Sequence, residues 1–231
     1  MPILDSKGDL LQAPTDVIYG GTFDPPHEGH RRVVERVLEK FPTVRVRIIP
    51  AAAPAGAYGQ HKQPHASFEH RQAMCELLLG DLAVVDGIEA TLARPNYSLR
   101  TLEALDKQYP GRSWALVVGR DQLESFAAWY QPERVVAKAS LLVIERETAG
   151  NLADELSLIG QKIGFQALPL SAESWRWQGL QTGIFSLGTA VSAAASRLIR
   201  DNIEQALAQG WLRPDIYQYI KRHGLYTERG A

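Results

Sequence analysis

The sequence predicts an α/β fold in which a doubly wound parallel sheet carries helices on both faces. Three observations support this prediction. Short apolar runs alternate with segments of helical spacing, which is typical of parallel sheets. The 231 residues, 45% hydrophobic and 22% charged, are enough for one sizeable domain with its own core. A glycine-rich turn follows the first apolar run, at the edge where open α/β sheets bind ligands.

The expected strands are short runs in which β-branched or aromatic residues dominate. In chain order they are Val17–Tyr19, Val44–Ile49, Ala83–Ile88, Trp114–Val118, Leu141–Ile144 and Phe165–Leu168. Segments with apolar residues three and four positions apart predict helices between and after them. These are Gly29–Lys40, Ser67–Leu79, Ser98–Tyr109, Asp121–Ala127, Ser192–Ala208 and Pro214–His223. Two stretches, Ala51–His65 and Ser171–Gly188, fit neither pattern, and the first is a long loop of a kind that often binds ligands.

Composition and charge exclude several classes of protein. The net charge of −1 argues against a broad nucleic-acid surface, and the single cysteine, Cys75, excludes an intrachain disulfide and a cysteine-based zinc cluster. No window approaches the ~18 apolar residues of a membrane span. Residues 1–14 contain three charged residues and no apolar signal core, so we expect a flexible flank and a cytoplasmic protein. Residues 15–231 are expected to form one domain with C-terminal helices from about 192.

The run from Gly20 to His30, GGTFDPPHEGH, is the most informative segment of the chain. It lies between an expected strand and an expected helix, an arrangement that directs free backbone N–H groups and a positive helix end at a phosphate. His27 and His30 add imidazole donors at the start of that helix. The P-loop and dinucleotide-binding glycine patterns are both missing. The run therefore predicts a nucleotide site of another type; the alternative is a structural turn with two surface histidines.

This run resembles the signature of the nucleotidyltransferase superfamily, (Gly/Thr)-x-Phe-Asp-Pro-x-His-x-Gly-His. The resemblance implies a Rossmann-like doubly wound parallel sheet of the HxGH type, with a small C-terminal helical part. It also implies in-line attack of an acceptor on the α-phosphate of a nucleoside triphosphate. His27 and His30 would be the catalytic residues, and the phosphate-binding residues would include Gly20, Gly21, Thr22 and Phe23.

Three later segments resemble those of bacterial nicotinate mononucleotide adenylyltransferases. They are Arg94–Leu105, Val118–Asp121 with Trp129 and Tyr130 at the expected spacing, and Pro214–Tyr226. The resemblance implies that ATP and nicotinate mononucleotide are the substrates and that nicotinate adenine dinucleotide and pyrophosphate are the products. Mg²⁺ would accompany ATP, held mostly by the triphosphate and water, and no side chain is assigned to a metal.

The residues that would bind the pyridine nucleotide come from two of these segments. Trp129 is suited to stack on the pyridine ring, and Asp121 to accept hydrogen bonds from ribose hydroxyls. Each has a structural alternative, because Trp129 fits a core position and Asp121 fits a helix N-cap. The full predicted set is Tyr97, Ser98, Gly119, Asp121, Trp129 and Tyr130.

Two segments depart from the superfamily pattern. The second signature, Ile-Ser-Ser-Thr-x-x-Arg, corresponds to Val191–Arg197, where Ser192 and Arg197 match but Ala193 and Ala194 replace two hydroxyl residues. Ser192 and Arg197 are predicted to bind the triphosphate, and Arg200 is a weaker candidate. In place of the usual Pro-Pro-His-Lys, the chain has the run QHKQPH from residue 60 to residue 65. There Lys62 is predicted to contact the phosphates, with an exposed loop residue without a role as the alternative.

Alternatives to this function stay open at the level of sequence. The same chemistry could act on nicotinamide mononucleotide or another phosphorylated acceptor, because a carboxylate and a carboxamide differ only in contacts that sequence does not resolve. A non-catalytic nucleotide-binding module is a further alternative, suggested by Ala193 and Ala194. No nucleic-acid or membrane partner is expected, and the sequence is compatible with a homo-oligomer.

Overall fold

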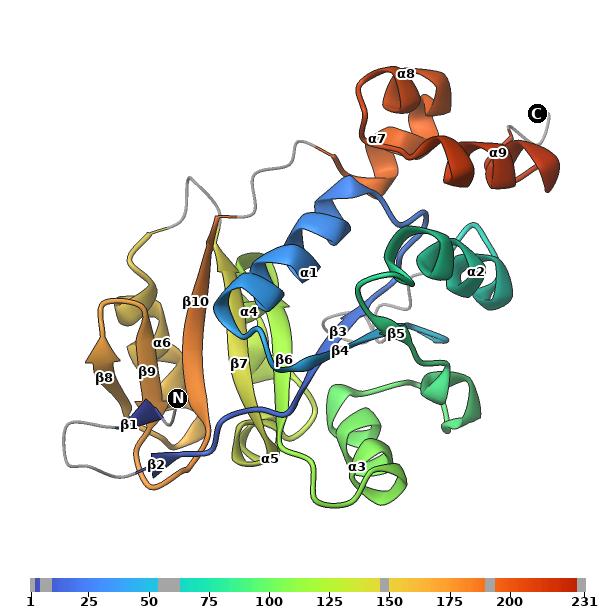
Figure 1. Ribbon diagram of the computed structural model, residues 1–231. Coiled ribbons are helices and arrows are strands. Elements are labelled where there is room, and N and C mark those ends of the chain that lie inside the picture. The colour runs from blue at the N-terminus through green and yellow to red at the C-terminus, as the bar shows by residue number, and fades with distance from the viewer. Residues whose placement is uncertain (1–2, 5–9, 54–62, 146–149, 190–193, 228–231) are drawn as a thin grey trace.

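The main feature of the computed structural model is a sheet of eight strands in the order β5-β4-β3-β6-β7-β10-β9-β8 (Figure 1). The structure describes residues 3–4, 10–53, 63–145, 150–189 and 194–227. Six neighbouring strands are parallel, and the last two join antiparallel. The parallel strands are β3 (Asp16–Gly21), β4 (Arg45–Pro50), β5 (Val84–Val85), β6 (Trp114–Gly119), β7 (Ala139–Glu145) and β10 (Gly183–Thr189). The antiparallel pair is β8 (Ala167–Ser171) and β9 (Ser174–Trp177).

Helices cover both faces of the sheet. One face packs against α1 (Glu28–Lys40) and α2 (Phe68–Leu79). The C-terminal helices α7 (Ser196–Asp201), α8 (Ile203–Ala208) and α9 (Pro214–Arg222) extend this layer beyond the sheet, and α9 contacts α2 (Figure 1). The other face packs against α3 (Ser98–Gln108), α5 (Pro132–Lys138) and α6 (Leu152–Ile163), with the short α4 (Arg120–Glu124), η2 (Ile88–Thr91) and η3 (Phe126–Ala128). The predicted α/β class is confirmed.

The period of two along the strands explains why the core divides into two layers. In β3, Val17 belongs to the layer under α1 and α2, whereas Ile18 belongs to the layer under α3. In β6, Val117 and Val118 divide in the same way. Side chains of a strand alternate between faces, so a strand covered on both sides must be apolar throughout. These strands therefore read as continuous apolar runs in the sequence.

Strand order places a switch point between β3 and β6. The chain forms β3, β4 and β5 in one direction and then returns to β6 on the opposite side of β3. Ligands of open α/β sheets bind at such a reversal, beyond the carboxyl ends of the strands. Gly20 and Gly21 are the last two residues of β3 at that edge. Residues 20–27, called the glycine turn below, lead from there to α1, which begins at Glu28. The C-terminal helices stand beside the start of α1 (Figure 1).

Several elements differ from those predicted. The described part of the predicted helix Ser192–Ala208 contains two helices, because the side chain of Asn202 caps α8 and interrupts the run. The stretch Ser171–Gly188, predicted to lie outside regular structure, contains β9 and most of β10. Helices α5 and α6 were not predicted at all. The sheet is mixed because β8 and β9 run antiparallel to their neighbours.

The segment before β3 also has structure. Ile3–Leu4 and Leu10–Leu11 pair as two short antiparallel strands, β1 and β2, and Leu11 is 2% exposed within the core. The side chain of Ser113 donates a hydrogen bond to the carbonyl of Ala13. The end of the predicted flexible flank is therefore packed against the domain. No helix in the described part of the chain is long and apolar enough to span a membrane.

Candidate active site

The two histidines of the glycine-rich run lie together at the start of α1. His27 is the N-cap residue, and its Nδ1 accepts a hydrogen bond from the backbone N–H of Gly29 at 3.2 Å. The backbone N–H of His27 in turn donates to Nδ1 of His30 at 3.1 Å. This reciprocal cap holds the two rings 3.8 Å apart, centroid to centroid. The sequence pattern predicted this proximity, and the cap supplies its geometry.

Hydrogen bonding and burial determine the charge state of the pair. Each Nδ1 accepts a backbone N–H, so each neutral ring carries its proton on Nε2. Burial lowers the pKa of His27 to about 4. Burial and the nearby His27 lower the pKa of His30 well below its ordinary value. At neutral pH the free protein therefore presents two uncharged imidazoles, each with one Nε2–H donor.

Packing of aromatic rings sets the shape of the glycine turn. Phe23 is 2% exposed, and its ring lies 4.9 Å from that of His30 and 5.5 Å from that of Tyr19. A Cβ atom on Gly21 would come within 3.0 Å of the Phe23 ring, so a side chain at this position would displace the ring. Phe23 itself has a positive φ of 51°, which is unusual for a residue other than glycine. The contacts of Phe23 with Gly21, Tyr19 and His30 therefore fix the backbone conformation of the turn beside the histidines.

Asp24 anchors this turn to two distant segments. Its buried carboxylate accepts hydrogen bonds from the N–H groups of His65 at 2.8 Å and Ala66 at 3.1 Å, and from the hydroxyl of Tyr226 at 2.8 Å. It also forms an ion pair with Arg200 at 3.7 Å. The hydrogen bonds outweigh burial and lower the pKa of Asp24. A charged carboxylate therefore ties the turn to the segment before α2 and to the C-terminal helices.

The C-terminal region contacts the turn through residues other than the expected one. Ser196 donates a hydrogen bond to the carbonyl of Pro25 at 2.9 Å, and Arg200 donates to the carbonyl of Asp24. Arg200, a weaker candidate for phosphate binding, therefore has a structural contact. Arg197 is exposed on α7 and makes no hydrogen bond or ion pair with another described residue. Ser192 and Lys62 lie outside the described residues.

Two tyrosines predicted for the pyridine site stack on one another. The rings of Tyr97 and Tyr130 are 4.7 Å apart and nearly parallel, and the guanidinium of Arg100 lies 5.3 and 5.6 Å from their centroids. Tyr97 is the N-cap residue of α3, which Ser98 begins. Asn96 fixes this helix start to the segment after β4, since its Oδ1 accepts the N–H of Ala53 at 2.7 Å. Arg100 was not predicted, although its place in the first turn of α3, three residues after Tyr97, is a usable signal.

The remaining predicted residues follow β6. Gly119 is the N-cap of α4, and the Asp121 carboxylate folds back so closely that a Cβ on Gly119 would lie 2.8 Å from its Oδ1. Asp121 lies in the first turn of α4 and is exposed, so the N-cap alternative is wrong. Its charge acts on Tyr19, whose pKa is raised chiefly by burial. Trp129 is half-buried, 5.0 Å from the Phe126 ring, and combines a core contact with a partly open face.

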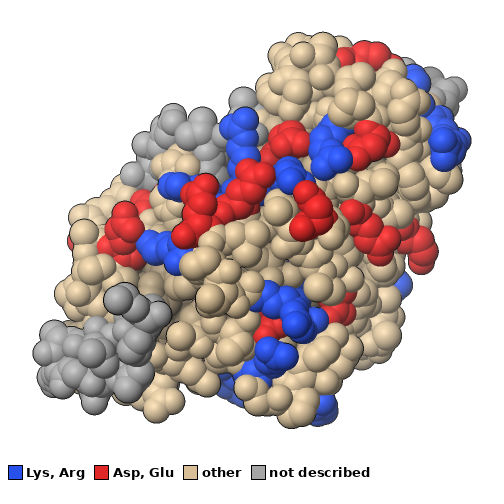
Figure 2. Space-filling view, in the orientation of Figure 1, with Lys and Arg blue, Asp and Glu red and all other residues tan. Residues whose placement is uncertain are grey.

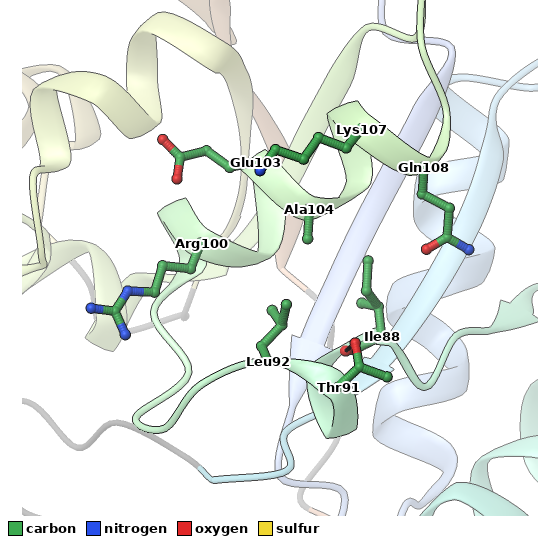
Figure 3. A pocket seen from close by; sticks show the side chains of 8 residues that line it. All are labelled: Ile88, Thr91, Leu92, Arg100, Glu103, Ala104, Lys107 and Gln108. Atoms are coloured by element: carbon green, nitrogen blue, oxygen red, sulfur yellow. Dashed lines mark hydrogen bonds between the residues drawn. The ribbon is translucent and has the colours of Figure 1, made fainter.

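The surface adds two observations. Figure 3 shows an open hollow between η2 and α3, lined by apolar residues such as Ile88 and Leu92 and by Arg100 and Lys107. None of the predicted site residues lines it. On the face seen in Figure 2, basic and acidic side chains lie side by side. Ion pairs such as the one between Arg31 and Asp81, at 2.8 Å, account for this mixing on and near α1.

Comparison with known proteins identifies the family of this chain. A family model described as cytidylyltransferase-like matches residues 18–186, which is more than half of the chain. The chain belongs to the cytidylyltransferase-like family. The match begins within β3 and ends within β10, so this family domain contains the glycine turn, both histidines and all predicted pyridine-site residues.

Individual relatives extend the likeness. A probable nicotinate-nucleotide adenylyltransferase of Rhodopirellula baltica is 42% identical over 132 residues, which cover 56% of this chain and 60% of that protein. One of Geobacter sulfurreducens is 30% identical over 216 residues, covering 92% of this chain and 98% of that protein. The resemblance predicted from the sequence is confirmed.

Solved structures show the same fold at low sequence identity. Plasmodium falciparum nicotinic acid mononucleotide adenylyltransferase complexed with NaAD is similar with a TM-score of 0.67 at 14% identity. That alignment covers 93% of this chain and 98% of that one. A putative nicotinate-nucleotide adenylyltransferase from Vibrio parahaemolyticus is similar with a TM-score of 0.57 at 16% identity. These two structures share the fold of this chain.

Proposed function

We propose that this protein transfers the adenylyl group of ATP to nicotinate mononucleotide, giving nicotinate adenine dinucleotide and pyrophosphate in NAD biosynthesis. The observation that carries the proposal is the pair of neutral imidazoles at the start of α1, at the switch point of the sheet. The names of relatives that align over about nine tenths of the chain support the same reaction.

The reaction is a single in-line displacement. The phosphate of nicotinate mononucleotide attacks the α-phosphorus of ATP, a new P–O bond forms, and the bond to the β-phosphate breaks as pyrophosphate leaves with the electron pair. No covalent bond to the protein is needed, so the protein acts by positioning and by stabilising charge. His27 and His30 each donate an Nε2–H to oxygens of the triphosphate, and such donors typically contribute about 10²–10³ in rate.

The residues around the histidines hold the triphosphate. Thr22 and Phe23, just past the end of β3, supply backbone N–H donors. Among the described residues a Cβ on Gly20 would meet only the carbonyl oxygen of Ile49 within 4 Å, which leaves room for a phosphate. Arg197 is exposed and supplies a cationic donor from α7. Ser192 and Lys62 complete the proposed set. Magnesium enters with ATP, bound mostly by phosphate oxygens and water.

The acceptor lies on the side of β6. Trp129 offers its open face to the pyridine ring, and the Tyr97–Tyr130 stack together with the start of α3 at Ser98 bounds the ring substituent. Gly119 allows close approach after β6, and Asp121 accepts hydrogen bonds from the ribose. Both nucleotides then meet at the carboxyl ends of β3 and β6, where an in-line approach to the α-phosphate is available.

The test measures pyrophosphate released from ATP and Mg²⁺ with nicotinate mononucleotide, nicotinamide mononucleotide or phosphopantetheine as acceptor. We expect release with nicotinate mononucleotide and little with the others. More pyrophosphate with nicotinamide mononucleotide than with nicotinate mononucleotide would show that the amide is the substrate. No pyrophosphate with any acceptor would favour a non-catalytic nucleotide-binding module. His27→Ala and His30→Ala should lower turnover about 10²- to 10³-fold. His70→Ala, which changes a histidine paired with Tyr219 between α2 and α9, is the matched control.

A further inference from the structure

A buried arginine beneath the glycine turn has no role in the chemistry described so far. Arg71 lies on α2 with 1% of its surface exposed. Its guanidinium donates to three backbone carbonyls: Thr22 at 2.6 Å, Ala51 at 2.7 Å and Ala66 at 3.2 Å. These carbonyls belong to the glycine turn, the segment after β4 and the segment before α2. One side chain therefore joins three segments that meet at the proposed triphosphate site.

The bond to Thr22 fixes the orientation of one peptide group. In a trans peptide the C=O and the following N–H point in opposite directions. Arg71 holds the carbonyl of Thr22 toward α2, so the N–H of Phe23 points away from α2. Within the described part of the chain this N–H donates to no acceptor. The positive φ of Phe23 accompanies this orientation and requires support from the surroundings.

Among the described residues, the guanidinium of Arg71 forms no close ion pair. No carboxylate of a described residue lies within 4.0 Å of its nitrogens. Burial lowers the pKa of Arg71, and the charge of Asp24 opposes that effect. The planar guanidinium of Arg71 donates to three carbonyl oxygens in different directions at once. The compact ammonium group of a lysine could not reach all three. The arrangement thus favours a role in orientation.

We propose that Arg71 is a positioning residue that holds the Thr22–Phe23 peptide so that the N–H of Phe23 donates to the triphosphate of ATP. The inference rests on the proposed function and deepens it on the ATP side. Loss of the guanidinium fork allows the peptide to rotate, which removes one preorganised donor. A misplacement of about 1 Å in such a site can cost about 10²-fold in rate.

The kinetic test uses Arg71→Lys with Arg47→Lys as its matched control. Arg47 lies within β4, three residues before its end, and is also buried, with 2% of its surface exposed. Unlike Arg71, it forms ion pairs with Asp16 and Asp86. We expect Arg71→Lys to lower kcat/KM for ATP about 10- to 100-fold, with KM for nicotinate mononucleotide changed less than about twofold. Arg47→Lys should reduce thermal stability without lowering kcat/KM for ATP more than it changes KM for nicotinate mononucleotide. A nearly normal kcat/KM for ATP in Arg71→Lys, or equal changes for both substrates, overturns the proposal.

A second measurement follows the Thr22–Phe23 peptide itself and does not depend on turnover. Thr22–Phe23 is the one Thr-Phe pair in the sequence, so labelling threonine carbonyls with ¹³C and phenylalanine amides with ¹⁵N gives a single correlated NMR signal. We expect that signal to move on addition of MgATP to the wild-type protein, and to move less in Arg71→Lys. An unmoved signal in a protein that binds MgATP overturns the inference alone. Failure to bind MgATP at all overturns both the inference and the proposed function.

Discussion

The buried state of His27 predicts an unusual dependence of stability on pH. The side chain is 7% exposed, and burial lowers its pKa from an ordinary 6.5 to about 4. Between these two values the unfolded chain binds a proton that the folded protein does not bind. Folding stability therefore falls as the pH drops through 6.5 and levels off below about 4.

The size of this effect follows from the shift. A difference of 2.5 units corresponds to about 3 kcal/mol in the free energy of unfolding. About 2 kcal/mol of it is lost between pH 7 and pH 5, where the folded form is still mostly neutral. His30 adds a loss of the same sign, because its pKa is also lowered. Asp24 does not contribute here, since its lowered pKa affects stability only at more acidic pH.

Urea unfolding at several pH values between 7 and 5 measures the effect. The variant His27→Asn removes the titration and keeps a side chain that can cap α1 through the N–H of Gly29. We expect the wild-type protein to lose about 2 kcal/mol more than this variant over that interval. Equal losses in the two proteins would refute the claim that a buried, neutral imidazole caps α1.

Three further predictions concern the turn and the acceptor side. Asp24→Asn weakens the contacts with Tyr226 and Arg200 and should reduce the free energy of unfolding by about 1–3 kcal/mol in urea titrations; an unchanged value would contradict the anchoring role. Gly21→Ala places a Cβ within 3.0 Å of the Phe23 ring and should reduce MgATP affinity measured by calorimetry, whereas wild-type affinity would show that the turn adjusts freely. Tyr130→Ala removes the stack on Tyr97 and should raise KM for nicotinate mononucleotide about 3- to 10-fold while KM for ATP stays constant.

The sequence predicted those parts of the fold where one physical signal dominates. Strands buried on both faces, such as the one around Val117, are recognisable because every position is apolar. The predicted strand Phe165–Leu168 overlaps β8, but β9 and β10 were missed. Trp175 and Trp177 do alternate with polar residues, but the alternation in β9 covers only four residues between turns. The break at Asn202 depends on a side-chain cap that competes with a continuous helical pattern.

The candidate site was predictable where the residues are close in sequence. His27 and His30 lie three positions apart on one helix start, so their proximity follows from helix geometry. The anchoring of Asp24 by Tyr226 joins residues 202 positions apart, and no local pattern encodes it. Arg71 did carry a signal: it is a charged residue on the same helical face as Met74, Cys75 and Leu78, which are all buried. A buried arginine must find acceptors, but only the fold shows that one of them is Thr22.

The central claim is that the site transfers an adenylyl group to nicotinate mononucleotide, and isotope transfer tests it most directly. The wild-type protein is incubated with Mg²⁺, nicotinate mononucleotide and ATP labelled with ³²P at either the α- or the γ-phosphate. The mechanism predicts that α-label appears in nicotinate adenine dinucleotide and γ-label in pyrophosphate, in equal amounts, and that both transfers require the acceptor. Label that stays in ATP, or α-label released as AMP without dinucleotide, would contradict the claim.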